Sequence, residues 1–162
     1  MNTKEQVIRL LKDYSKYQRK IALLRYELEH PAQISPDEML DAMAFARGDG
    51  SGRSEGTVSN KTLYIAMNYQ QKAERLNREN MDDIVQRLIP LENEINRLDY
   101  YVGMLEEKQQ EIIRLYFFEK KSWRKISEMT STSVRRLRDV KDMAVDALVD
   151  MYAFVSGSDG AK

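Results

Sequence analysis

Apolar residues recur at helical spacings through most of the chain, and the clearest case is its first segment. Between residues 3 and 29 they alternate at intervals of three and four, which suits a helix that packs along another helix. These positions are Val7, Leu10, Tyr14, Tyr17, Ile21, Leu24 and Leu28. A residue before proline resists the helical conformation, so His30, which precedes Pro31, should mark the end of this helix.

The next segment predicts a short helix followed by a loop. Ser35 and Glu38 have the spacing of a capping box, and Pro36 suits the first helical position, so we expect a helix over residues 36–47. Residues 48–56 hold four of the seven glycines, which predicts a flexible loop over residues 48–58. This loop lacks the preceding strand and the Lys-Ser/Thr pair of a P-loop, so we expect no nucleotide site there.

A long helix is predicted over residues 60–102. Its apolar positions form two regular stretches, and their register shifts by one residue near residues 77–80. The first stretch is Ala66, Tyr69, Ala73 and Leu76, and the second is Met81, Ile84, Leu88, Leu91, Ile95, Leu98, Val102 and Leu105. Pro90 lies inside the second stretch, so we expect either a kink or break near it or two helices that meet there.

The C-terminal third predicts three shorter helices and a flexible tail. The helices are Glu107–Glu119, Trp123–Met129 after a capping Ser122, and Val134–Phe154 after a capping Ser133. Residues 156–162 form the tail. The chain is therefore predicted to be all-α, with a long helical hairpin or coiled-coil arm in residues 1–103 and a C-terminal helix-turn-helix domain in residues 104–155.

The residue types argue against an enzyme, a metal site, a cofactor and a membrane span. The chain has 162 residues, no cysteine and one histidine, so it has no set of thiolates or imidazoles for a metal. No carboxylate is placed with a His, Cys or Gly-rich site in a way that suggests catalysis. No apolar run approaches the roughly 18 residues of a membrane span, and no signal peptide is evident, so we expect a cytoplasmic protein.

One block of the chain is strongly basic, although the chain as a whole carries 26 basic and 26 acidic residues. Residues 120–141 contain eight basic and two acidic side chains, a net charge of +6, which points to an anionic partner. If Val134, Leu137 and Val140 face inward, the polar residues between them should face outward from the last helix. A solvated basic helix bundle that binds nothing is the alternative.

The spacing of these charges suits double-stranded DNA. A helix with cationic side chains on its first two turns can enter the major groove, where Arg forms paired hydrogen bonds to guanine and other cations contact phosphates. We expect the last helix to contribute Ser133, Arg135, Arg136, Arg138, Asp139 and Lys141. Arg124 and Lys125, at the start of the preceding helix, should contact phosphates and position the domain.

Residues 104–148 resemble the helix-turn-helix of sigma factor region four, and still more its relatives in phage late-gene activators of the ArpU and RinA type. The stretch 111–117 (EIIRLYF) is similar to the first helix of that family, and residues 122–128 (SWRKISE) to its Ser-Trp-x-x-Ile-Ala-Glu helix. Residues 133–148 follow its recognition helix without a gap. The rest of the chain resembles the phage proteins in architecture only.

Three residues depart from the family pattern. Lys120 and Ser131 stand where that family usually has glycine, and Thr132 replaces a usual apolar residue. Ser131 can adopt the turn at some cost in free energy. Base-reading positions vary within such families, so the resemblance implies no particular DNA sequence.

Together, the residues and the resemblance predict a sequence-specific transcription activator of phage or prophage late genes, acting in the cytoplasm of a bacterial host. The resemblance implies a direct or indirect contact with RNA polymerase. A DNA-packaging protein of the small-terminase kind and a coiled-coil adaptor or inhibitor that binds proteins are the alternatives. We also expect a homodimer, because one helix cannot cover both apolar stretches of residues 60–105 unless the C-terminal domain covers part of them.

Overall fold

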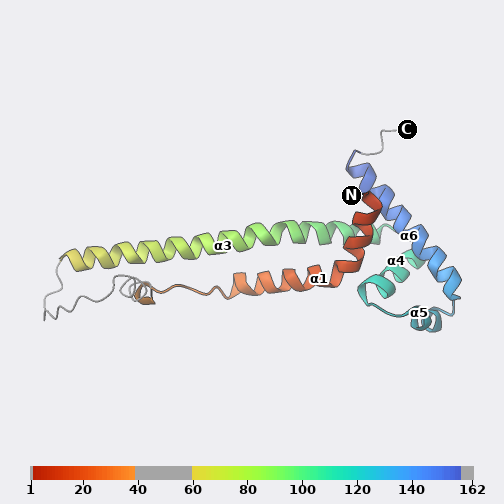
Figure 1. The fold of residues 1–162 in the computed structure, drawn as a ribbon, viewed down its shortest axis with the longest axis horizontal. Helices are drawn as coiled ribbons and strands as arrows, with labels where there is room; N and C mark the ends of the chain where they lie inside the picture. The colour runs from red at the N-terminus through yellow and green to blue at the C-terminus, as the bar shows by residue number, and fades with distance from the viewer. Residues whose placement is uncertain (1, 39–59, 158–162) are drawn as a thin grey trace. The chain divides into compact units, whose positions relative to one another are not determined.

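The computed structural model describes residues 2–38 and 60–157, and within these ranges the fold is all-α (Figure 1). Its helices are α1 (Thr3–Glu29), α3 (Asn60–Gly103), α4 (Glu107–Ile113), the π-helical turn η1 (Arg114–Phe118), α5 (Trp123–Thr130) and α6 (Val134–Val155). No strand occurs in these two ranges. The predicted all-α class is confirmed. None of the described helices has the length and apolarity needed to cross a bilayer.

Polar side chains fix the starts of two N-terminal helical segments. The Asn2 side chain accepts a hydrogen bond from the Lys4 backbone at 3.3 Å, at the start of α1. The predicted capping box is present: Ser35 Oγ accepts from Glu38 N and the Glu38 carboxylate accepts from Ser35 N, both at 3.1 Å. Helical conformation begins at Pro36, and the remainder of the predicted helix 36–47 and the loop 48–58 lie outside the described residues.

The chain divides into two compact units, and the division differs from the expected one at residue 103. One unit combines the residues up to Ala22 with those from Pro90 onward, and the other is Leu23–Ile89. Helices α1 and α3 therefore each contribute to both units. The physical reason is that the start of α1 and the end of α3 bury their apolar side chains in one core with the C-terminal helices.

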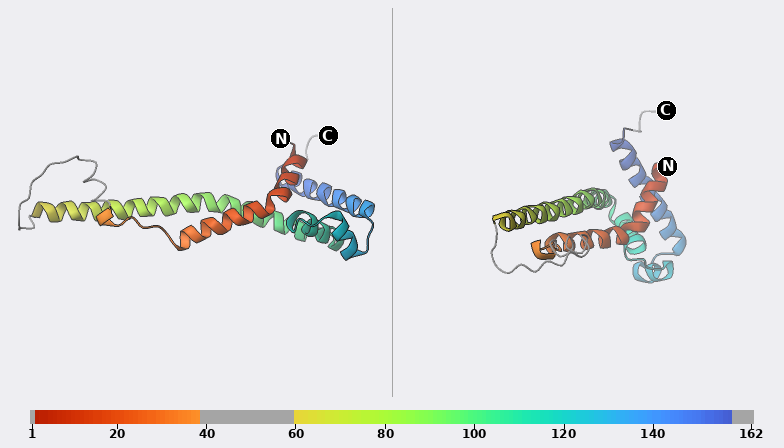
Figure 2. Two further views of the ribbon diagram at one scale, coloured as in Figure 1. Left: turned by 60° about the horizontal axis from the view of Figure 1, so that its bottom comes forward. Right: turned by 60° about the vertical axis from the view of Figure 1, so that its left-hand side comes forward.

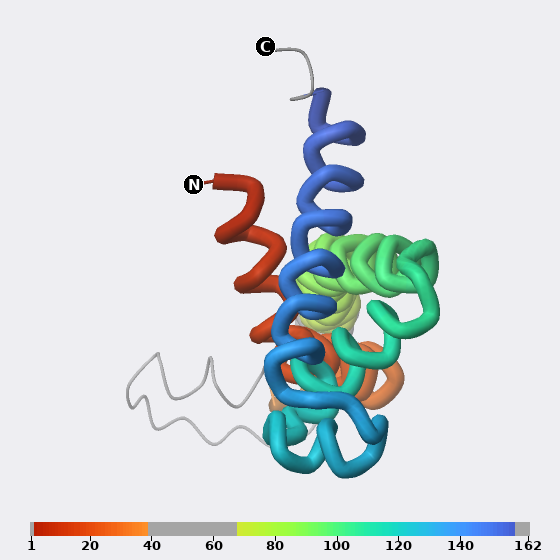
Figure 3. The backbone as a smooth tube through the Cα atoms, turned by 90° about the vertical axis from the view of Figure 1, so that its right-hand side faces the viewer, coloured from red at the N-terminus to blue at the C-terminus, as the bar shows by residue number. Residues whose placement is uncertain are grey.

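That core draws on α1, α3, α4, η1 and α6. It contains Val7 and Leu11 from α1 and Leu98 and Val102 from α3, and its other members are Leu105, Ile113, Phe117, Ala144, Val145, Leu148 and Tyr152. The first half of α1 runs beside α6 in every view (Figures 2 and 3). Leu11 is completely buried although it is not among the predicted apolar positions, because α1 packs against several helices and so buries a wider face than a single partner requires.

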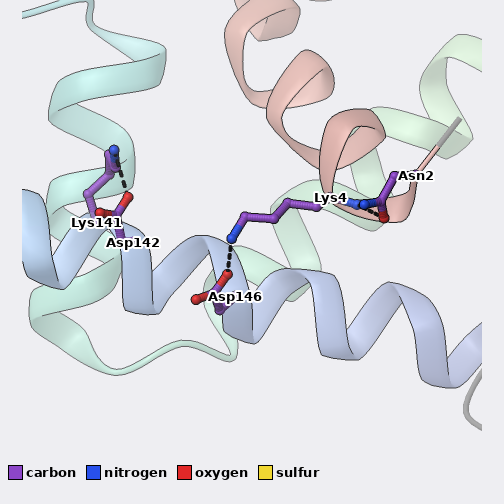
Figure 4. Close-up of polar contacts among 5 residues, drawn as sticks. All are labelled: Asn2, Lys4, Lys141, Asp142 and Asp146. Atoms are coloured by element: carbon purple, nitrogen blue, oxygen red, sulfur yellow. Dashed lines mark hydrogen bonds and ion pairs between the residues drawn. The ribbon is translucent and has the colours of Figure 1, made fainter.

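Polar contacts accompany this packing. Tyr14 Oη donates to the Asp99 carboxylate on α3 at 2.9 Å, and burial together with Asp99 raises the pKa of the Tyr14 hydroxyl. The Lys4 ammonium lies 2.7 Å from the Asp146 carboxylate on α6 (Figure 4). Asp146 raises the pKa of Lys4, but both side chains are more than half exposed, so this ion pair adds little stability.

Helix α3 is continuous from Asn60 to Gly103, with Pro90 inside it, so the alternative of two helices meeting near residue 90 is wrong. The division between the units falls directly before this proline. In the second apolar stretch, Leu98 and Val102 are buried in the core of their own chain. Those two positions therefore need no second copy to cover them.

In the other unit, the segment after α1 is attached to α3 by one side chain. Asn77 Oδ1 accepts from Ile34 N at 2.9 Å, and Asn77 Nδ2 donates to Ile34 O at 3.3 Å. The neighbouring Ala73 is buried. The shift in apolar register that the sequence shows near residues 77–80 thus begins where α3 makes a polar contact instead of an apolar one.

Candidate functional site

The helices α4, η1, α5 and α6 share a small apolar cluster. Its buried members are Ile112, Leu115, Ile126 and Leu137, and Tyr116, Trp123 and Val140 pack against it while half-buried. Ile126 on α5 and Leu137 on α6 are both about as inaccessible as a residue can be, at 0% and 1% exposure. The inward positions predicted for Ile126 and Leu137 are therefore confirmed, whereas Met129, at the same helical spacing on α5, is 51% exposed.

Residues Ser131–Ser133 join α5 to α6, and hydrogen bonds fix this turn at both ends. Ser133 Oγ accepts from Arg136 N at 3.3 Å and so caps α6, as the sequence predicts. Ser127 Oγ donates to Thr132 O at 2.7 Å, and Thr132 Oγ1 donates to Thr130 O at 3.1 Å. Thr132 can replace the usual apolar residue because its half-buried hydroxyl is hydrogen-bonded.

Helix α5 is capped in the same way, since Ser122 Oγ accepts from Lys125 N at 3.3 Å. It is bounded by the two residues that depart from the glycine pattern noted above. Lys120 before it has φ 56°, and Ser131 after it has φ 53° and ψ 34°. They are the non-glycine residues with positive φ in the described part of the chain. The left-handed conformation that favours glycine is therefore kept at both positions.

The segment before α5 contains a π-helical turn that the sequence does not reveal. The predicted helix Glu107–Glu119 is present, but η1 widens it over Arg114–Phe118, with Glu119 N donating to Arg114 O at 2.9 Å. The wider turn lets consecutive side chains reach different neighbours. Phe117 enters the main core, Tyr116 faces Trp123, and Phe118 stacks on Tyr14.

The outer face of α6 is basic over its first two turns. Arg135, Arg136 and Arg138 are exposed, and so is Asp139. At the start of α5, Lys125 is exposed, and Arg124 is 90% exposed while it pairs with Glu128 at 3.3 Å. The structure thus places these predicted residues, with the capping Ser133, on two neighbouring helices of one unit.

Trp123 connects the two helices. Its ring stacks on Tyr116, with centroids 4.2 Å apart and planes inclined by 18°, and the Arg138 guanidinium carbon lies 6.0 Å from the Trp123 centroid. A cation over an indole face is attracted by the ring quadrupole. Trp123 therefore both packs within the fold and restricts the position of one of the exposed arginines.

Lys141 does not share the exposed face, so its predicted outward orientation is wrong. Its side chain is 24% exposed and pairs with Asp142 at 2.8 Å (Figure 4). It lines a hollow together with Lys4 and Ile8 of α1. The sequence contained the signal: Lys141 lies four residues after Leu137 and seven after Val134, which places it on the inward side of α6.

No group of three or more His, Asp or Glu side chains in the described ranges could hold a metal ion. The arrangement that the structure builds is a pair of capped helices with a fixed turn and an exposed set of cations.

Residues 3–149 match the family model described as "Protein of unknown function (DUF722)", which covers most of the chain. No curated protein and no solved structure matches this chain.

Proposed function

We propose that this chain, which belongs to the DUF722 family, is a sequence-specific DNA-binding transcription activator of phage or prophage late genes. The observation that supports this most is the exposed set of Arg135, Arg136 and Arg138 on the first two turns of α6. In this proposal α6 enters the major groove, where paired guanidinium hydrogen bonds read guanine edges.

The neighbouring elements suit the same role. Arg124 and Lys125 lie at the start of α5, where contacts to phosphates would fix the orientation of α6 without reading bases. The Arg124 pairing with Glu128 is exposed, so a phosphate can replace the carboxylate at low cost. Leu137 and Ile126 hold α5 and α6 together from the inside, which makes the pair a rigid support for these contacts.

The activator role, the phage context and a contact with RNA polymerase follow from the resemblance to the ArpU and RinA type. The backbone supports the resemblance at two specific residues. Lys120 and Ser131 occupy that family's glycine positions, and both have the positive φ that a glycine there would serve. A chance similarity in the order of the helices would not by itself produce a positive φ at both positions.

The proposal includes a homodimer in which a second copy covers apolar side chains left exposed on α3. Met81 and Ile89 are 37% and 49% exposed, and half-buried Val85 lies between them at the same helical spacing. Two copies would present two α6 helices to two half-sites.

DNA titrations test the binding site. We expect the triple variant Arg135→Ala, Arg136→Ala and Arg138→Ala to lose at least tenfold in affinity for duplex DNA at moderate salt, since each good base contact is worth about 1–3 kcal/mol. The matched control removes three exposed cations of α3, Lys72, Arg75 and Arg87, and should bind as the parent does.

Fluorescence anisotropy with labelled duplexes gives the affinities, and circular dichroism checks that each variant keeps its helices. Equal affinity of the parent and the triple variant would remove α6 from the interface. A parent that binds no DNA even at low salt would instead favour the protein-binding adaptor. A ring-shaped oligomer with weak, sequence-tolerant binding would favour the packaging alternative.

A further inference from the structure

Helix α1 carries a second basic surface, separate from the exposed cations of α5 and α6. Lys12, Lys16 and Arg19 are all exposed, and their spacing of four and three residues aligns them on one face of α1. Leu11 and Tyr14 of the same helix pack into the core. We call these three residues the α1 basic stripe.

The stripe is attached to the segment that leads into α5. Lys120 Nζ donates to the Lys12 backbone oxygen at 2.6 Å, and Ser15 Oγ donates to the Phe118 backbone oxygen at 3.2 Å. The Tyr14 and Phe118 rings stack with centroids 3.7 Å apart. All of these residues belong to one compact unit, so the stripe and the start of α5 are held together.

The contact between Lys120 and Lys12 adds a cation beside the stripe without neutralising it, because the acceptor is the Lys12 backbone oxygen and not a carboxylate. Asp13, the acidic residue within residues 9–20, faces Arg9 at 3.9 Å. Among the described residues, the stripe has no ion pair with a carboxylate.

We propose that the α1 basic stripe binds the phosphate backbone of the same DNA duplex, beside the stretch that α6 reads. This inference rests on the proposed function and extends it. Lys120 lies against α1 and precedes Arg124 and Lys125 by four and five residues, so the row of cations on α1 and the cations at the start of α5 belong to one compact unit. A row of cations suits a polyanion with regularly spaced phosphates, but contacts to phosphates do not read bases.

The salt dependence of DNA binding measures these contacts. In the double variant Lys12→Gln and Lys16→Gln the side chains lose their charges, while the Lys12 backbone oxygen that accepts from Lys120 remains. Each lost phosphate contact should reduce the slope of log affinity against log salt by about 0.9, so we expect a reduction of about 1.8. Lys72→Gln with Arg87→Gln, two exposed cations of α3, is the charge-matched control and should keep the parent's slope.

The probes are random-sequence duplexes of about one and about three helical turns of roughly 10 base pairs each. We expect the reduction with the long duplex and a smaller one with the short duplex, where no flanking phosphates remain. If the double variant keeps the parent's slope on the long duplex while the triple arginine variant of α6 loses binding, the stripe is not a DNA contact and the proposed function stands. If the parent itself binds no duplex, both proposals fall.

Discussion

Two residues around α5 hold a backbone conformation that costs an ordinary L-residue roughly 1–2 kcal/mol. A glycine at position 131 should avoid this cost, because Ser131 is exposed and serves to form the turn. We expect Ser131→Gly to unfold with a free energy about 1 kcal/mol higher than Ser131→Ala, which removes the same hydroxyl and keeps the Cβ. Urea titration followed by circular dichroism gives both values. Equal stability of the two variants would mean that the left-handed turn is not formed in solution.

Trp123 is the residue at which folding and binding are hardest to separate, because it packs on Tyr116 and also faces Arg138. We expect Trp123→Ala to destabilise the fold by about 3 kcal/mol, the lower end for a large aromatic residue, since Trp123 is only half-buried. Trp123→Phe keeps a ring against Tyr116 and should cost less. Thermal melting decides the matter: an unchanged midpoint combined with lost DNA binding would make Trp123 a DNA-contacting residue.

Several individual residues could be predicted because their roles depend on local spacing. The caps Ser122 and Ser133 and the buried Ile126 and Leu137 follow from helix starts and helical period, and all four are confirmed. The outward orientation predicted for Lys141 is wrong because its position, four residues after the buried Leu137, determines its orientation more than its charge does.

At the scale of elements, the helix bounds were predictable to within a residue or two. Helix α1 matches its predicted range Thr3–Glu29, and α3 extends one residue beyond 102. The π-helical turn η1 was not predictable, because a run of consecutive apolar residues fits both a helix and a wider turn. The continuity of α3 through Pro90 was open for a related reason, since a proline weakens a helix without ending it when tertiary packing compensates.

Pro90 lacks the backbone donor that would otherwise bond to Gln86, and it is exposed. We expect Pro90→Ala to raise the free energy of unfolding by up to about 3 kcal/mol, because alanine restores this hydrogen bond. The neighbouring exposed Asn93→Ala is the control and should change stability by a few tenths only. Hydrogen exchange of residues 86–94 would show where the change acts. A loss of stability in Pro90→Ala would mean that the structure at the division between the units depends on the proline.

At the scale of the whole molecule, the sequence predicted helices but not how they group into units. Periodicity shows that Val7 and Tyr14 share a face of α1, yet it does not show what covers that face. The covering comes from residues about 85 to 145 positions later in the chain, Asp99 and Val145 among them, and such distant contacts leave no local pattern. For this reason the sequence does not reveal that parts of α1 and α3 join the C-terminal helices in one unit.

The burial of α3 side chains in the core of their own chain limits which substitutions can test the homodimer. Leu98 is completely buried in the core of its own chain, so a charged residue there would unfold the protein instead of dissociating it. We expect Met81→Glu with Ile89→Glu to dissociate the dimer, because both side chains are exposed on α3. Light scattering at micromolar concentration measures the mass. A mass near 19.0 kDa for the parent would exclude a stable dimer.

The proposed role of α6 is to select particular DNA sequences through Arg135, Arg136 and Arg138, and recovery of bound DNA from the cell is its decisive test. DNA bound to the protein in the producing cell is recovered and sequenced across the genome, for the parent and for the triple alanine variant. We expect a small number of enriched sites upstream of late genes for the parent and the loss of these sites in the variant. Uniform recovery of DNA by the parent, or the same enriched sites in both proteins, would contradict it.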